Sequence, residues 1–193
     1  SLLNQLASSL PGANKDKVAA AVEKEEYERA ASIVAKQLGD FDFQAAISAS
    51  FPDAKLTTVD VSAKAVAYVP LLASGLVITT NYDGVLEYVF ERAGRRFERV
   101  VLGSNPNEIV PAIQQNRRTL WKLHGDRNDA RTRVLAKGDY DRHYKDLPAL
   151  LALAFANRPA LFLGCALERD RTVDVLADMH TRWPGVRHFA LLQ

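Results

Sequence analysis

Hydrophobic and polar residues follow two different patterns along the chain, and the change falls near residue 75. In the first part, apolar residues recur at helical spacing, as in Leu2, Leu3, Leu6 and Leu10, which predicts amphipathic helices. Pro11, Gly12, Gly39 and Pro52 interrupt that pattern. The helices predicted in this part span residues 2–10, 17–38, 43–50 and 59–73.

From Gly75 onward, short apolar runs rich in β-branched residues alternate with helical patterns. The predicted strands are 76–79, 97–102, 119–123, 160–163 and 187–192, and the predicted helices are 85–92, 108–115, 139–145, 147–157 and 172–180. Strands that alternate with helices predict a layered α/β fold with a largely parallel sheet. The helical first part is expected to form a subdomain beside it.

Length and composition restrict the protein class. With 193 residues, one domain is expected, made of a helical part (1–74) and an α/β part (75–193). The net charge of +2 does not favour direct nucleic-acid binding. No apolar run approaches the roughly 20 residues of a membrane helix, so we expect a cytoplasmic protein without membrane binding. The single cysteine, Cys165, excludes an intrachain disulfide and a four-thiolate zinc site.

The two ends of the sequence lie inside predicted elements. Ser1 begins within the first helical pattern, and the chain stops within the last predicted strand. This pattern predicts that the chain is a fragment of a longer polypeptide.

Polar, turn-forming residues directly follow three of the predicted strands. They are Thr79–Gly84, His124–Asp126 and Gly164–Asp170. Ligands of open parallel sheets bind outside the carboxyl ends of the strands. The three loops therefore predict a binding site at one edge of the sheet.

Each of these loops also has a purely structural interpretation. Asn81 and Asp83 fit a helix cap and a first-turn carboxylate, and His124 fits a turn before Gly125. Gly164–Cys165 fits a tight turn with a small buried thiol. The other histidines, His143, His180 and His188, are interpreted as surface or packing residues, and the sequence contains no HExxH, CxxC, GxGxxG, GxSxG or GxxxxGK[ST] motif.

Taken together, Ile78–Asp83, Lys122–Asp126 and Leu161–Thr172 resemble, in order and spacing, the sirtuin-like domain of bacterial defence proteins. The resemblance implies a Rossmann-like three-layer fold with a helical subdomain, and NAD as the ligand. Many such domains cleave the nicotinamide–ribose bond, and the loss of NAD aborts phage infection. They work with a sensor or activator, such as an Argonaute-type protein or an ATPase, often through oligomerisation.

The resemblance also implies roles for individual residues. Asn81 and His124 correspond to catalytic residues, and the residues that correspond to nucleotide contacts are Thr80, Asp83, Gly164 and Cys165. The chain departs from deacetylating sirtuins, because no zinc-ribbon cysteines follow Gly125, so we expect no metal and no deacetylase. The first strand of the family and its Gly-Ala-Gly turn would precede Ser1 and are not in the chain.

These observations favour an NAD glycohydrolase in which Asn81 holds the ribose and His124 acts as general base. Asp83 is expected to orient a ribose hydroxyl or to compensate positive charge. Two other hypotheses stay open at this point: a non-catalytic module that binds NAD or ADP-ribose and signals to a partner, and a structural α/β domain without a ligand.

Overall fold

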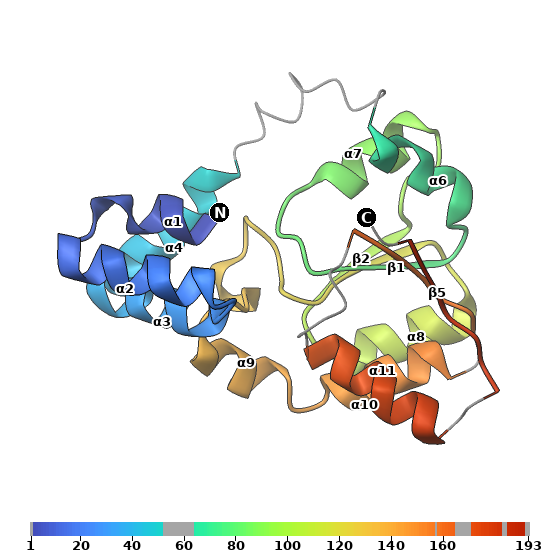
Figure 1. Ribbon diagram of the computed structural model, residues 1–193. Coiled ribbons are helices and arrows are strands. Elements are labelled where there is room, and N and C mark those ends of the chain that lie inside the picture. The colour runs from blue at the N-terminus through green and yellow to red at the C-terminus, as the bar shows by residue number, and fades with distance from the viewer. Residues whose placement is uncertain (1, 52–63, 157, 165–170, 183–184, 192–193) are drawn as a thin grey trace.

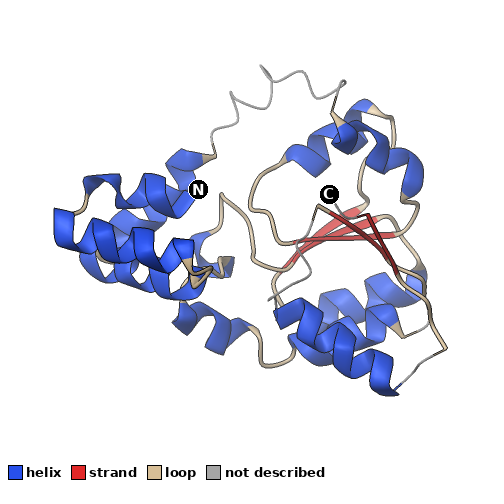
Figure 2. Ribbon diagram, viewed as in Figure 1, coloured by secondary structure: helices blue, strands red, loops and turns tan. Residues whose placement is uncertain are grey.

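The computed structural model describes residues 2–51, 64–156, 158–164, 171–182 and 185–191. A group of N-terminal helices lies beside an α/β part in which helices cover both faces of the strands (Figures 1 and 2). The N-terminal elements are α1 Leu2–Leu6, the 3₁₀ turn η1 Ala7–Ser9, α2 Gly12–Glu23, α3 Tyr27–Leu38 and α4 Asp40–Ser50. No helix among these described residues is long and apolar enough to cross a membrane.

The N-terminal helices enclose a core of their own. Small residues on α3, Ala30 and Ala31, are fully buried and allow the neighbouring helices to approach closely. Val18, Val34 and Ile47 fill the space between α2, α3 and α4. Burial of this apolar surface is what stabilises these short helices, which would be marginal in isolation.

The single helix predicted for residues 17–38 is wrong, because the chain reverses between α2 and α3. Glu25 adopts a left-handed conformation with φ of 60°. The backbone N–H groups of Glu25 and Glu26 donate to the carbonyls of Val22 (3.1 Å) and Ala21 (2.8 Å), which ends α2. The reversal brings α3 back along α2, so that both bury their apolar faces in one core.

The helix predicted for residues 59–73 is also wrong in its described part, while residues 59–63 lie outside the described residues. Lys64 is extended, and it precedes a 3₁₀ turn, η2 Ala65–Tyr68, and a short helix, α6 Val69–Leu72. Pro70 is in the first turn of α6. A proline has no N–H to donate, and in the first turn of a helix that N–H would have no intrahelical partner.

The α/β part is built on parallel strands. After α6 its elements are β1 Leu76–Thr79, α7 Val85–Arg92, β2 Arg99–Leu102, α8 Pro106–Gln115, β3 Thr119–Lys122, the 3₁₀ turn η3 Ala130–Thr132, α9 Lys137–His143, α10 Leu147–Phe155, β4 Leu161–Leu163, α11 Arg171–Arg182 and β5 Phe189–Leu191. The first sheet has the order β1-β3-β2, and both of its pairs are parallel. The predicted α/β fold with a parallel sheet and an N-terminal helical region is confirmed.

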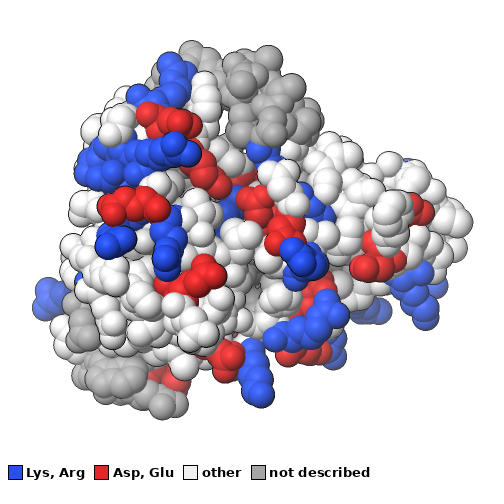
Figure 3. All heavy atoms as spheres, turned by 180° about the vertical axis from the view of Figure 1, so that it is seen from behind, with Lys and Arg blue, Asp and Glu red and all other residues white. Residues whose placement is uncertain are grey.

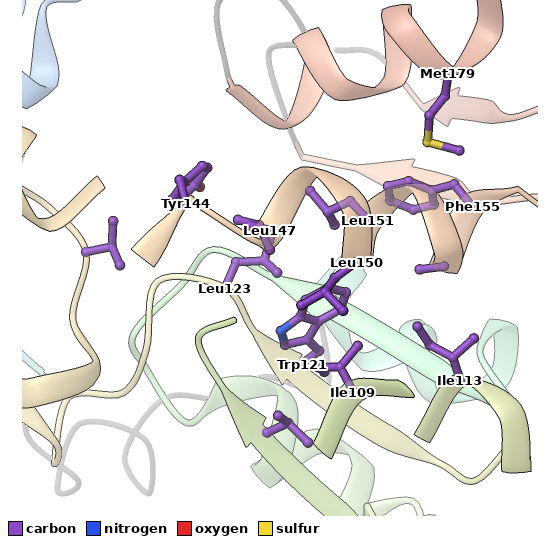
Figure 4. Close-up of a cluster of buried hydrophobic side chains, with 13 residues drawn as sticks. Ile109, Ile113, Trp121, Leu123, Tyr144, Leu147, Leu150, Leu151, Phe155 and Met179 are labelled. Carbon is purple, nitrogen blue, oxygen red and sulfur yellow. The ribbon is translucent and has the colours of Figure 1, made fainter. Parts of the chain in front are cut away.

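The central strand β3 separates two apolar cores. Trp121 is fully buried on the side of α8 and α10, among the side chains drawn in Figure 4. Its indole N–H donates to the carbonyl of Gly103 over 2.6 Å. Leu120 faces the opposite side, where it packs with Phe90 of α7. This alternation places the last residue of β3, Lys122, on the α7 side of the sheet.

The remaining strands form a second sheet. β4 and β5 are parallel partners, with Phe162 opposite Ala190. Among the described residues they are not hydrogen-bonded to β1-β3-β2, so the expectation of a single sheet is corrected. Phe162 nevertheless packs against the same apolar core as Leu76 and Ile78 of β1. The second sheet therefore rests on the same layer of helices as the first.

Surface charge is mixed. On the face opposite to the view of Figure 1, basic and acidic side chains are interspersed over the described residues (Figure 3). This distribution agrees with the small net charge of +2.

Candidate functional site

Strand pairing brings two of the predicted loops together at the carboxyl edge of the first sheet. Thr79, the last residue of β1, lies opposite Lys122, the last residue of β3. Beyond the strands, the N–H of Leu123 donates to the Thr79 carbonyl (2.9 Å), and the N–H of Arg127 donates to the Tyr82 carbonyl (3.2 Å). The segments that carry Asn81 and His124 are therefore neighbours, as the sequence predicts.

The segment after β1 presents polar groups at this edge. Thr80 and Asn81 are exposed, and the Asn81 N–H donates to the hydroxyl of Thr79 over 3.1 Å. Asp83 is half-buried, and its Oδ1 accepts the N–H of Val85 over 3.0 Å at the start of α7. The N-cap of α7 is Gly84, so the structural interpretation is wrong for both residues: Asn81 does not cap the helix, and Asp83 precedes its first turn and forms a local turn with Val85.

His124 is half-buried and is held by aromatic neighbours. Its Nε2 lies 2.7 Å from the hydroxyl of Tyr144, a buried residue just after α9. The ring of Tyr140, on α9, packs edge-on against the imidazole with centroids 5.5 Å apart, and Tyr82 lies at 6.5 Å. Sequence reasoning missed both α9-side tyrosines. Their i, i+4 spacing on one helical face was the available signal.

The residue after His124 must be glycine for a structural reason. Gly125 has a φ of +81°, in the left-handed region that residues with a Cβ rarely adopt. A Cβ there would overlap the backbone carbonyl of Thr132 and lie 2.6 Å from its Oγ1. The turn at Gly125 therefore sets the direction of the backbone at His124. The turn interpretation of the His-Gly pair holds, and it leaves the imidazole of His124 available for the functional interpretation.

Lys122 was not singled out from the sequence, yet its side chain is fully buried beside both loops. Its Nζ donates to the carbonyls of Tyr82 (3.1 Å) and Asp83 (2.7 Å). It also contacts Glu87 of α7 at 3.1 Å and Asp126 at 2.6 Å. A lysine at the end of an otherwise apolar central strand was the signal available in the sequence.

A second buried cation joins the N-terminal helices to this region. The guanidinium of Arg133 donates to the carbonyl of Gln44 (2.8 Å) and to the hydroxyl of Ser48 (2.6 Å), both on α4. It also donates to the carbonyls of Asp126 and Arg127. The segment that follows His124 is therefore fixed on one side to α4.

Tyr82 joins the loop after β1 to the segment that follows the His124 loop. Its hydroxyl donates to the carbonyl of Val134 over 2.6 Å, and its side chain is buried. Burial is the main cause that raises the pKa of Tyr82 far above its usual value of 10.0, and the nearby Tyr140 and Asp139 raise it further.

This shift predicts a loss of stability at alkaline pH. Below pH 10 the hydroxyl is protonated in both states, whereas above pH 10.0 the unfolded chain releases a proton that folded Tyr82 retains. The free energy of unfolding then falls by up to about 1.4 kcal/mol per pH unit. In urea unfolding between pH 9 and 11, Tyr82→Phe should have a shallower slope than the wild type. A Tyr27→Phe control should keep the wild-type slope, because Tyr27 is exposed, and equal slopes in both variants would refute this assignment.

The third predicted loop follows the second sheet. Gly164 comes directly after β4 and has a φ of +65°, and Cys165 lies outside the described residues. Strand pairing does not place Gly164 next to Asn81 or His124, so its part in the site stays a prediction.

One of the remaining histidines, His188, lies away from the sheet edge that carries Asn81 and His124. His188 packs edge-on between the rings of Phe155 and Phe162, and its Nδ1 accepts the N–H of Ala160, which confirms a packing role. Within the described ranges, no group of three or more His, Cys, Asp or Glu side chains could hold a metal ion.

A family model described as the SIR2-like domain matches residues 75–193, which include all three candidate loops. No curated protein matches the chain.

Proposed function

The chain belongs to the SIR2-like domain family, and we propose that it binds NAD at the carboxyl edge of β1 and β3 and hydrolyses its nicotinamide–ribose bond. Membership of the family suggests NAD-related activity and is consistent with an NAD-using enzyme. The finer assignment, a glycohydrolase with Asn81 and His124 as its catalytic residues, is our proposal.

The observation that carries the proposal is the placement of an amide and an imidazole at one sheet edge. The register of β1 against β3 brings the exposed Asn81 and the half-buried His124 onto adjacent loops. Amide groups donate and accept hydrogen bonds, as a ribose diol requires, and imidazole exchanges protons near neutral pH. This donor set fits the ribose end of NAD.

The proposed reaction breaks the bond between C1′ of the ribose and the nicotinamide nitrogen. The electron pair of that bond leaves with nicotinamide, which is neutral once released and requires no general acid. A water oxygen bonds to C1′, and the proton of that water passes to His124, so that the products are nicotinamide, ADP-ribose and a proton. The protein contributes positioning and electrostatic stabilisation of positive charge on the ribose.

The neighbours of His124 support its role as general base. The hydroxyl of Tyr144, 2.7 Å from Nε2, fixes the plane of the ring. The base role requires the tautomer in which Nε2–H donates to Tyr144 and Nδ1 accepts the proton of the water. Packing against Tyr140 limits rotation of the imidazole. A base held in this way keeps its proton-accepting atom in one place.

The nucleotide contacts extend from the same edge. Thr80 is exposed next to Asn81. Oδ1 of Asp83 accepts the N–H of Val85, so we assign Oδ2 to a ribose hydroxyl. Gly164 and Cys165 are proposed to approach the nucleotide from the second sheet. Activation by a partner protein stays a prediction from the sequence resemblance.

The direct test measures nicotinamide in reactions of the protein with NAD, together with calorimetric titration of NAD. Release of nicotinamide and ADP-ribose in equal amounts, increasing with time, is the expected result. Saturable NAD binding without release would instead select the non-catalytic binding module. Absence of both binding and release would contradict any NAD site at this edge.

A further inference from the structure

Lys122 has more hydrogen-bond acceptors than it has protons to donate. Four oxygens lie within 3.1 Å of its Nζ: the carbonyls of Tyr82 and Asp83 and the carboxylates of Glu87 and Asp126. An ammonium group has three N–H donors, so at least one of them is shared. The side chain is fully buried, whereas Glu87 and Asp126 remain partly exposed.

Stability alone does not account for a lysine at this point of the strand. The other residues of β3, Thr119, Leu120 and Trp121, are buried without charge. A buried ion pair can often be replaced by apolar residues at little or no cost in stability, because the desolvation of two charges offsets their attraction. The particular groups that Lys122 contacts are therefore the informative feature.

Those groups flank the two proposed catalytic residues. The carbonyls of Tyr82 and Asp83 belong to the residues that directly follow Asn81, and Asp126 lies two residues after His124. The Tyr82 carbonyl also accepts the N–H of Arg127. It is therefore bonded to Lys122, which precedes the His124 loop, and to Arg127, which follows His124. One buried ammonium group is thus bonded to both loops at once.

We propose that Lys122 is a positioning residue that fixes the loop carrying Asn81 relative to the loop carrying His124. The catalytic part of this proposal rests on the proposed function, whereas the coupling of the loops does not. Lys122 contacts neither the substrate nor the reacting atoms. It acts by holding backbone carbonyls on one side and Asp126 on the other.

The first arm of the test measures turnover. Lys122→Met retains the length of the side chain and removes its donors, and kcat for nicotinamide release is expected to fall about 10²-fold, the cost of misplacing reacting groups by about 1 Å. Glu87→Gln is the matched control. It removes one charge from the cluster but keeps an amide oxygen that can accept from Nζ, and it leaves the contacts to Tyr82, Asp83 and Asp126, so kcat should change less than about threefold.

The second arm measures backbone hydrogen exchange and needs no NAD. In Lys122→Met, the Arg127 amide, which donates to Tyr82, is expected to exchange about tenfold faster because the loop opens more often. The Glu98 amide, which donates to the Arg118 carbonyl before β3, is the internal control and should keep its rate. Global loss of stability would raise both rates together.

The outcomes separate the two proposals. If the wild type does not cleave NAD, the proposed function fails, and the Arg127 exchange rate still decides whether Lys122 couples the loops. Unchanged exchange at Arg127 overturns the coupling, and faster exchange with unchanged kcat overturns the catalytic part. Lys122→Gln, which keeps a donor, is measured in the same way. If neither variant folds, Lys122 is a folding residue and the proposal is wrong.

Discussion

Replacing His124 with alanine is expected to lower the rate of nicotinamide release by about 10²- to 10⁴-fold, the usual contribution of a positioned general base. The fold should survive, because His124 is half-buried at the sheet edge and its ring lies at the border of the first apolar core, beside Tyr140 and Tyr144. Asn81→Ala should lose activity as well, since it removes the amide proposed to hold the ribose. Chromatography of nicotinamide, with circular dichroism of each variant, provides the measurement.

The matched control for His124→Ala is His180→Ala. His180 is on α11 and is exposed, so its loss should leave turnover unchanged. If His124→Ala and Asn81→Ala both retain near-wild-type turnover while His180→Ala behaves as expected, the assignment of the catalytic residues is wrong.

Gly125→Ala is expected to cause the second large effect, a loss of about 3–5 kcal/mol in the free energy of unfolding. Part of this loss is the cost of placing an alanine at φ of +81°, about 1–2 kcal/mol. The remainder comes from the overlap of the new Cβ with the Thr132 carbonyl, which forces the loop to move. Urea unfolding followed by far-ultraviolet circular dichroism measures the change.

Gly94→Ala separates these two causes. Gly94 has a φ of +67°, but a Cβ there would meet no atom within 4 Å. Its replacement should therefore cost only about 1–2 kcal/mol, the conformational part. If the two alanine variants lose the same stability, the contact with Thr132 does not constrain the turn after His124.

The strands were predictable because each is a short apolar run between turn residues. β1 begins and ends at the predicted residues, and β3 ends one residue earlier than expected. The break between α2 and α3 could not be predicted in the same way. It occurs at Glu25, where no glycine or proline marks the turn, and it is stabilised by core packing between helices rather than by a local signal.

The candidate site residues that lie in the loop directly after a predicted strand could be identified from the sequence. Asn81 and His124 are of this kind, and the register of β1 and β3 brings their loops together as expected. The sequence offers a signal for Lys122 and for Tyr144 but not their partners, because those partners depend on contacts across the fold. Lys122 reaches 39 and 40 residues back to Asp83 and Tyr82, and Tyr144 approaches His124 only because α9 packs beside it.

The third loop shows how connectivity limits such inference. Gly164 follows β4, as predicted, but β4 pairs with β5 and not with the strands of the first sheet among the described residues. The sequence pattern identifies a strand and its loop without specifying the neighbouring strand.

The central claim, that NAD binds at the edge where β1 and β3 end, is tested most directly by nuclear magnetic resonance of the histidine rings. The chain has four histidines, so the ring signals can be assigned by single substitutions. On titration with NAD, the His124 signals should shift to saturation, and those of His188, which pack between Phe155 and Phe162, should not. Saturable NAD binding that leaves the His124 signals unchanged would contradict the account.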